Sequence, residues 1–134
     1  MRLGCVPLLL LCFAAGCSTG SSNAGERGPG PGAWRAKANV ACKRPFTRLS
    51  QLQAQNNDAT HTAGAIDVVL PKLRNVHPPD GVKADYQSFL DTLAAERDAA
   101  PDPQATLAQW KRANDLADRL DLRRCVQPKF RQTS

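Results

Sequence analysis

Apolar side chains recur at helical spacing from residue 34 onward, and the first two predicted helices follow from them. In the first segment, most lie three or four positions apart, at Trp34, Ala38, Ala41, Cys42, Pro45, Leu49 and Leu52. In the second, about residues 60–75, they are Ala63, Ile66, Val69, Leu70 and Leu73. Because proline lacks the amide hydrogen that a helix interior uses, the pattern predicts a kink or break at Pro45 and at Pro71.

Two further helices are predicted in the second half of the chain. "HPPDG", residues 77–81, ends the second segment, and Asp80 is predicted to cap the third helix. The apolar residues of the third helix are Val82, Tyr86, Phe89, Leu90 and Leu93. "AAPDP", residues 99–103, ends it, with Asp102 as the cap of the fourth helix and Pro103 in its first turn. The fourth carries Leu107, Trp110, Ala113, Leu116, Ala117 and Leu120.

No segment shows the alternation of a strand beyond a few residues. Residues 34–128 are therefore expected to form an all-α domain, an up-down-up-down bundle of four helices. The apolar content, 42% of 134 residues, is enough for one core.

The N-terminal segment has the layout of a secretory signal peptide. Met1 and Arg2 form a short positive region, and residues 3–15 form an apolar stretch that is too short to span a bilayer. Small residues follow, and the chain then becomes polar. We expect residues 1–16 to be removed.

"AAGC", residues 14–17, resembles the lipobox of bacterial lipoproteins. The resemblance implies that the Cys17 thiol receives a diacylglyceryl group, that cleavage precedes Cys17, and that the freed amine is often acylated. The chain would then be lipid-anchored on the extracytoplasmic face of the cell membrane. The family prefers Leu where Ala14 stands. Ala14 and Gly16 also satisfy the general signal peptidase, which would cut the same bond and leave Cys17 free.

The cysteine count bears on this choice. Of five cysteines, Cys5 and Cys12 fall in the removed segment. If Cys17 carries lipid, Cys42 and Cys125 remain as a pair; if it does not, one thiol is stranded in an oxidising compartment. An even number of antiparallel helices brings the chain ends to the same end of a bundle. The Cys42–Cys125 disulfide is therefore predicted.

A second resemblance covers most of residues 34–125. "WRAKANVAC" in the first helix, "PP" before the helix with Tyr86 and Phe89, and the closing "LADRLDLRRC" are similar to small exported helical lipoproteins of actinobacteria. In that group a cysteine in the first helix faces one just after the last helix. The usual Leu-Gly pair before the final cysteine is Leu120-Asp121 here. The resemblance implies a fold and a location, but no activity.

The formal net charge of +6 is unevenly distributed. Residues 17–33, rich in Gly, Ser and Pro, are expected to be a flexible tether, and residues 129–134 a basic tail. Basic residues gather in 18–48 and 123–134, while the middle is acidic overall. We predict that they face anionic lipid headgroups near the anchor; the alternative is that they only solvate the ends of the domain. These residues are Arg35, Lys37, Lys43, Arg44, Arg48, Arg123, Arg124, Lys129 and Arg131.

No catalytic, metal or cofactor site is predicted. His61 and His77 stand at opposite ends of the second helical stretch, about 24 Å apart in helical rise, so they cannot share an ion from that element. The carboxylates in "ERD", residues 96–98, and "DLADRLD", residues 115–121, are expected to lie on a solvent-exposed helix face. An exported, tethered chain is not expected to bind nucleic acid.

Three function classes remain. The first is a non-catalytic module that binds an envelope component or an unknown envelope protein. The second is a small-molecule carrier with an inter-helix pocket, which predicts a sizeable apolar cavity. The third is an enzyme whose site one sequence does not reveal, which predicts converging titratable groups of perturbed pKa.

Overall fold

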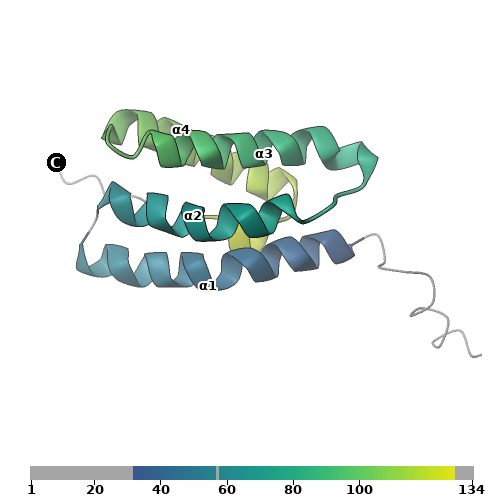
Figure 1. Ribbon diagram of the computed structural model, residues 1–134, viewed down its shortest axis with the longest axis horizontal. Coiled ribbons are helices and arrows are strands. Elements are labelled where there is room, and N and C mark those ends of the chain that lie inside the picture. The colour runs from purple at the N-terminus through teal and green to yellow at the C-terminus, as the bar shows by residue number, and fades with distance from the viewer. Residues whose placement is uncertain (1–31, 57, 129–134) are drawn as a thin grey trace, which may run out of the picture. The chain divides into compact units, whose positions relative to one another are not determined.

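The computed structural model describes residues 32–56 and 58–128. The predicted signal peptide, Cys17, most of the tether, Lys129 and Arg131 lie outside these residues. Four helices, α1 (Ala33–Gln55), α2 (Ala59–Arg74), α3 (Asp80–Asp98) and α4 (Pro103–Arg119), are followed by a short 3-10 helix, η2 (Arg123–Cys125) (Figure 1). Helix accounts for 81% of this part of the chain, and no strand occurs in it.

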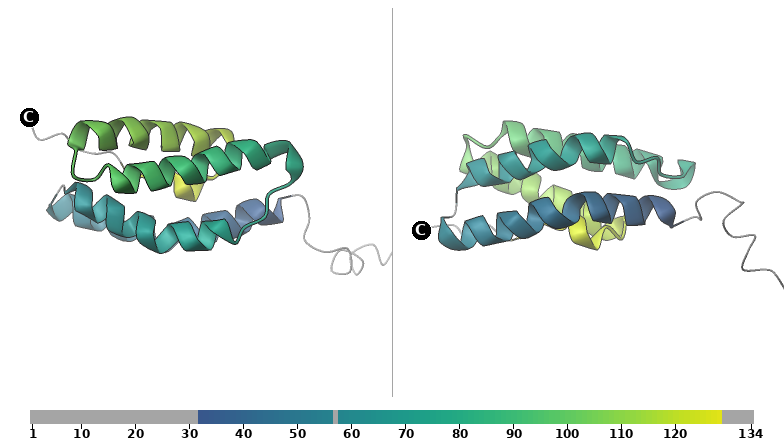
Figure 2. Two further views of the ribbon diagram at one scale, coloured as in Figure 1. Left: turned by 45° about the horizontal axis from the view of Figure 1, so that its top comes forward. Right: turned by 60° about the horizontal axis from the view of Figure 1, so that its bottom comes forward.

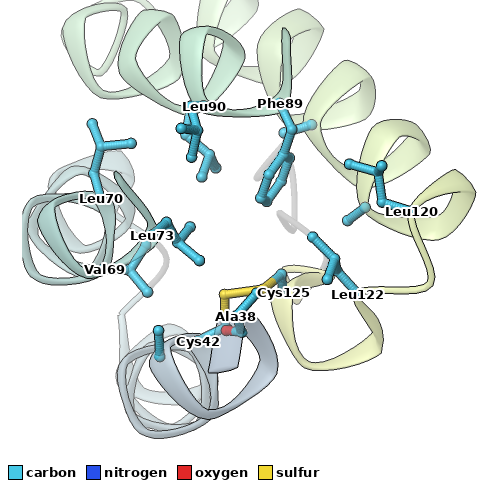
Figure 3. Packing of buried hydrophobic residues seen from close by; sticks show 14 of the residues in the cluster. Ala38, Cys42, Val69, Leu70, Leu73, Phe89, Leu90, Leu120, Leu122 and Cys125 are labelled. Atoms are coloured by element: carbon cyan, nitrogen blue, oxygen red, sulfur yellow. A yellow bond between two sulfur atoms is a disulfide. The ribbon is translucent and has the colours of Figure 1, made fainter. Parts of the chain in front are cut away.

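The helices pack as an antiparallel bundle, as predicted. Along the chain, α1 packs on α2, α2 on α3, and α3 on α4 (Figure 2). The segment η2 packs on α1 and lies between α1 and α4 (Figure 3). Because each connection is short, sequential helices are spatial neighbours. This arrangement confirms the predicted up-down-up-down bundle.

Neither internal proline ends its helix. The helix α1 continues past Pro45 to Gln55, and α2 continues past Pro71 to Arg74. Of the two outcomes predicted at each proline, a kink or a break, the break is therefore wrong. Each proline removes one backbone hydrogen bond. In α1, however, Cys42 before the proline and Phe46 after it are both buried in the same core. Packing on both sides therefore holds the helix together through the proline.

The caps follow the predicted chemistry with one shift. The Asp102 carboxylate accepts hydrogen bonds from the amides of Gln104 and Ala105, and Pro103 is the first helical residue of α4. The predicted cap of α3 is displaced by one position, because the cap is Pro79 and Asp80 already belongs to the helix. Proline's extended backbone conformation at this position starts the helix without a side-chain cap.

The core lies between all four helices and η2. Most residues of the predicted apolar faces are buried in it. The half-buried exceptions are Pro45, Leu52, Ala63, Val82, Leu107 and Trp110. Phe46 was not predicted and replaces its neighbour Pro45 on the inner face. Figure 3 shows part of this cluster, whose fully buried large apolar members are Leu49, Ile66, Val69, Leu70, Leu73, Phe89, Leu93, Leu120 and Leu122.

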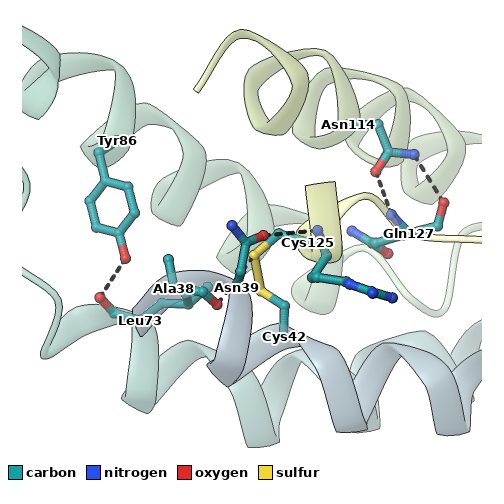
Figure 4. The surroundings of a disulfide bond; sticks show 9 residues. Ala38, Asn39, Cys42, Leu73, Tyr86, Asn114, Cys125 and Gln127 are labelled. Carbon is teal, nitrogen blue, oxygen red and sulfur yellow. Dashed lines mark hydrogen bonds between the residues drawn. A yellow bond between two sulfur atoms is a disulfide. The ribbon is translucent and has the colours of Figure 1, made fainter. Parts of the chain in front are cut away.

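The predicted disulfide joins α1 to η2. Cys42 and Cys125 are both fully buried, and their Cα atoms lie 5.0 Å apart. Two polar contacts also connect α1 with the C-terminal part of the domain, one at the end of α4 and one at η2. The Arg35 Nε donates to the Leu120 carbonyl at 2.9 Å. The Arg124 amide donates to Asn39 Oδ1 at 2.9 Å, and Figure 4 shows this bond beside the disulfide. The beginning of α1 is thus fastened to the end of α4.

Candidate functional site

The candidate site is an open groove between α1 and α2 with a volume of about 520 Å³. We call it the α1–α2 groove. Two adjacent antiparallel helices leave such a groove where their facing side chains are small or absent. Its lining residues are Arg44, Pro45, Arg48, Leu49, Leu52, Thr60, His61, Gly64, Ala65, Val68 and Lys72.

The floor of the groove is apolar and partly open to water. Leu49 is buried, Leu52 and Ala65 are half-buried, and Val68 is 51% exposed, which is high for an aliphatic side chain. Gly64 leaves the middle of the α2 wall without a side chain. A Cβ built on Gly64 meets no atom within 4 Å, so it would project into open space.

The cations of the groove come from both helices. Gln53 Nε2 of α1 donates to the Thr62 hydroxyl of α2 at 3.4 Å, which shows the antiparallel register of the two helices. In that register Arg44 lies across from Lys72 at one end, and Leu52 lies across from Gly64 toward the other. Arg48 falls between the two ends.

None of the described residues that line the groove carries a carboxylate. The two nearest acids of α2 are used elsewhere: Asp67 lies 3.6 Å from Arg97 of α3, and Asp58 accepts the Thr60 amide as the N-cap. That hydrogen bond holds the pKa of Asp58 below its usual value. Within residues 32–56 and 58–128, Arg44, Arg48 and Lys72 form no ion pair. Their charge is therefore available to a ligand.

The two histidines lie at opposite ends of α2. His61 is half-buried at the far end of the groove, in the first turn of α2, and His77 is exposed after the end of α2. In the part of the chain that the structure describes, no group of three or more potential ligands could hold a metal ion.

The remaining predicted basic residues occupy other places. Lys43, Arg123 and Arg124 line a second, more polar hollow of about 310 Å³ beside η2. The guanidinium of Arg35 lies 4.8 Å from the ring centre of Trp34, and Lys37 is exposed. The basic residues are thus distributed along α1 and on two of its flanks.

One functional candidate was missed by the sequence reasoning. Glu96, taken as part of a solvated face, is only 1% exposed, and its Oε2 accepts a hydrogen bond from Gln127 Nε2 at 2.7 Å. Burial raises the pKa of Glu96 to about 7, and the hydrogen bond from Gln127 opposes part of that rise. Its position, one turn after Leu93 on the apolar face of α3, is the signal that could have revealed the burial.

Gln127 is held in place by α4. Its amide donates to Asn114 Oδ1 at 2.8 Å, and Asn114 Nδ2 donates back to the Gln127 carbonyl at 3.4 Å (Figure 4). Trp110 Nε1 donates to the Pro128 carbonyl at 3.1 Å. These bonds fasten residues 127 and 128 to α4 and bring Gln127 onto Glu96.

Among the residues that the structure describes, the two groups with large pKa shifts lie far apart. Burial also raises the pKa of Tyr86, whose hydroxyl donates to the Leu73 carbonyl at 2.7 Å. Tyr86 and Glu96 both belong to α3 and are separated by about 15 Å of helical rise. They do not form one acid–base pair.

Comparison with protein families, with curated proteins and with solved structures finds no match to this chain. In the part of the chain that the structure describes, no helix combines the length and apolar character needed to cross a membrane.

Proposed function

We propose that the chain is exported and anchored by lipid on Cys17 to the extracytoplasmic face of the cell membrane, where its helical domain acts as a non-catalytic binding module. The main support is the disulfide between Cys42 and Cys125. Such bonds persist in oxidising compartments. This pairing leaves Cys17 as the remaining cysteine beyond the predicted cleavage site, which is the position that the lipobox resemblance assigns to the lipid.

The binding surface in this proposal is the α1–α2 groove. It offers cations and apolar contacts together, which suits recognition of a molecule that has both characters. The hollow formed by Lys43, Arg123 and Arg124 would add a weaker attraction to anionic headgroups, worth up to about 1 kcal/mol for each nearby cation. An envelope protein with an acidic surface is the other partner that this charge favours.

A second candidate function is that of a small-molecule carrier. The groove volume of about 520 Å³ falls in the range of small-ligand sites and favours this candidate. Both candidates use the same surface, and they differ in the size of the ligand.

Intact-mass analysis of protein extracted from membranes tests the proposal. The expected mass is that of residues 17–134 plus the lipid, with two alkylatable thiols that appear only after reduction. The Cys17→Ser variant serves as the control and should leave the membrane fraction. A water-soluble chain with a thiol at its first residue that reacts without reductant would contradict lipid anchoring.

A further inference from the structure

We infer that the α1–α2 groove binds an amphiphile with one anionic head group and a single apolar chain. This inference deepens the proposed binding role of the same groove and rests on it. It follows from three features of the groove: its cations, its apolar floor and the absence of a side chain at Gly64.

The cations select the head group. In the register of the two helices, Arg44 lies across from Lys72 at one end of the groove, and Arg48 follows one turn along α1. None of the described residues that line the groove is an acid. Guanidinium groups bind carboxylate or phosphate oxygens in a bidentate manner, and such charge-assisted hydrogen bonds are stronger than neutral ones. An anionic head group therefore binds at this end, while a cationic one is repelled.

The floor selects the tail. From Arg44 to Leu52, α1 rises about 12 Å, the length available to an extended chain of medium size. Along this path the ligand would cover the exposed parts of Leu52, Ala65 and Val68, which leaves less apolar surface in contact with water. Gly64 keeps the path open.

The shape of the site distinguishes this ligand from a membrane surface. A flat layer of headgroups contacts the rims of a groove but does not fill it, whereas a single chain lies on the floor. The predicted ligand is therefore a dispersed amphiphile, and the bilayer itself is the competing occupant that the experiment must exclude.

The experiment titrates decanoate, below the concentration at which it aggregates, into the full chain carrying Cys17→Ser. Because Cys17 is replaced, the result does not depend on whether that residue is lipidated. Chemical-shift changes of backbone amides should concentrate in residues 44–52 and 60–72. Decanol lacks the charge and acetate lacks the tail. Each should bind at least about tenfold more weakly than decanoate.

Two variants test the groove itself. Gly64→Leu fills the middle of the groove from a position where no atom stands in the way, and leucine favours helix over glycine. This variant should fold and lose decanoate binding. The double variant Arg44→Gln/Arg48→Gln should weaken binding roughly tenfold or more. Its matched control is Lys111→Gln/Arg112→Gln, which removes two exposed cations of α4 and should leave binding unchanged.

Several results would overturn the inference. These are equal affinity for decanoate and decanol, unchanged binding by folded Gly64→Leu, or an equal loss in the α4 control. Binding to vesicles of anionic lipid without binding of dispersed decanoate would assign the cations to a membrane surface. None of these results bears on the mass of the native membrane form, so failure here is distinct from failure of lipid anchoring.

Discussion

Replacing Glu96 with glutamine should make the domain more stable at neutral and alkaline pH. Glu96 is buried, and its ionised form has one hydrogen-bond donor, Gln127 Nε2. Among the described residues, Glu96 Oε1 and Gln127 Oε1 have no hydrogen-bond partner. Glutamine keeps the size and an acceptor oxygen, removes the charge, and brings an amide donor to this pair.

The magnitude follows from the pKa. Glu96 has a pKa of about 7 in the folded chain against an ordinary value of 4.5, so the folded state holds the proton more tightly than the unfolded state. The stability that protonated Glu96 contributes is fully present below pH 4.5, and it is lost as the pH rises through 7. At 1.36 kcal/mol per pKa unit, the loss is about 3 kcal/mol.

The assay is urea unfolding of the disulfide-intact domain, followed by circular dichroism between pH 4 and pH 8, for wild type and Glu96→Gln. Subtracting the two free energies of unfolding cancels the other titrating groups. The difference should rise in favour of the variant by about 3 kcal/mol between these limits. Asp85→Asn, which removes an exposed carboxylate of α3, is the control and should show little change with pH.

A difference that does not vary with pH would refute the reasoning, because it would mean that Glu96 titrates alike in folded and unfolded chains. So would a difference that falls as the pH rises, since this would make the ionised form the stabilising one.

Three further predictions concern stability. The double variant Cys42→Ala/Cys125→Ala should lower the free energy of unfolding by about 4–5 kcal/mol, the chain-entropy value for a loop of this length, as measured by denaturant unfolding; no loss would show that the bond is redundant. Asp121 has a φ of 57°, a conformation that glycine adopts more easily. The Asp121→Gly variant should therefore raise the free energy of unfolding of the domain by about 0.5–1 kcal/mol, visible as a higher urea midpoint. Asp102→Ala should cost about 1 kcal/mol in the same assay, because it removes the cap of α4, and an unchanged midpoint would contradict that role.

The bundle could be predicted from the sequence because its signals are local. Helical spacing gave the inner faces, turn residues gave the boundaries, and the even helix count placed Cys42 near Cys125. Whether Pro45 and Pro71 interrupt their helices could not be predicted from such local signals. Whether Pro45 breaks α1 depends on the packing of Phe46 and its neighbours against other helices, and tertiary contacts decided it.

The candidate site was less predictable for the same reason. The basic residues were identified, but their division between two hollows depends on helix register, which the one-dimensional pattern does not fix. Glu96 was misassigned because a charged residue beside Arg97 normally faces water. Its burial depends on Gln127, which lies in a different part of the sequence and reaches Glu96 only after the chain reverses at the end of α4.

That reversal links the features of the C-terminal segment. The Leu122 amide bonds to the Ala117 carbonyl at 2.8 Å and the Asp121 amide to the Asp118 carbonyl at 3.0 Å, a Schellman motif with Asp121 in the left-handed position. Glycine is the usual residue at this position, because it adopts positive φ without a steric penalty. The turn sends the chain back along α1, so one backbone geometry serves both the disulfide at Cys125 and the contact with Glu96. The α1–α2 groove lies where α1 faces α2. The C-terminal segment with η2 packs on α1 from a different side, between α1 and α4. Ligand binding in the groove should therefore leave the pH dependence due to Glu96 unchanged.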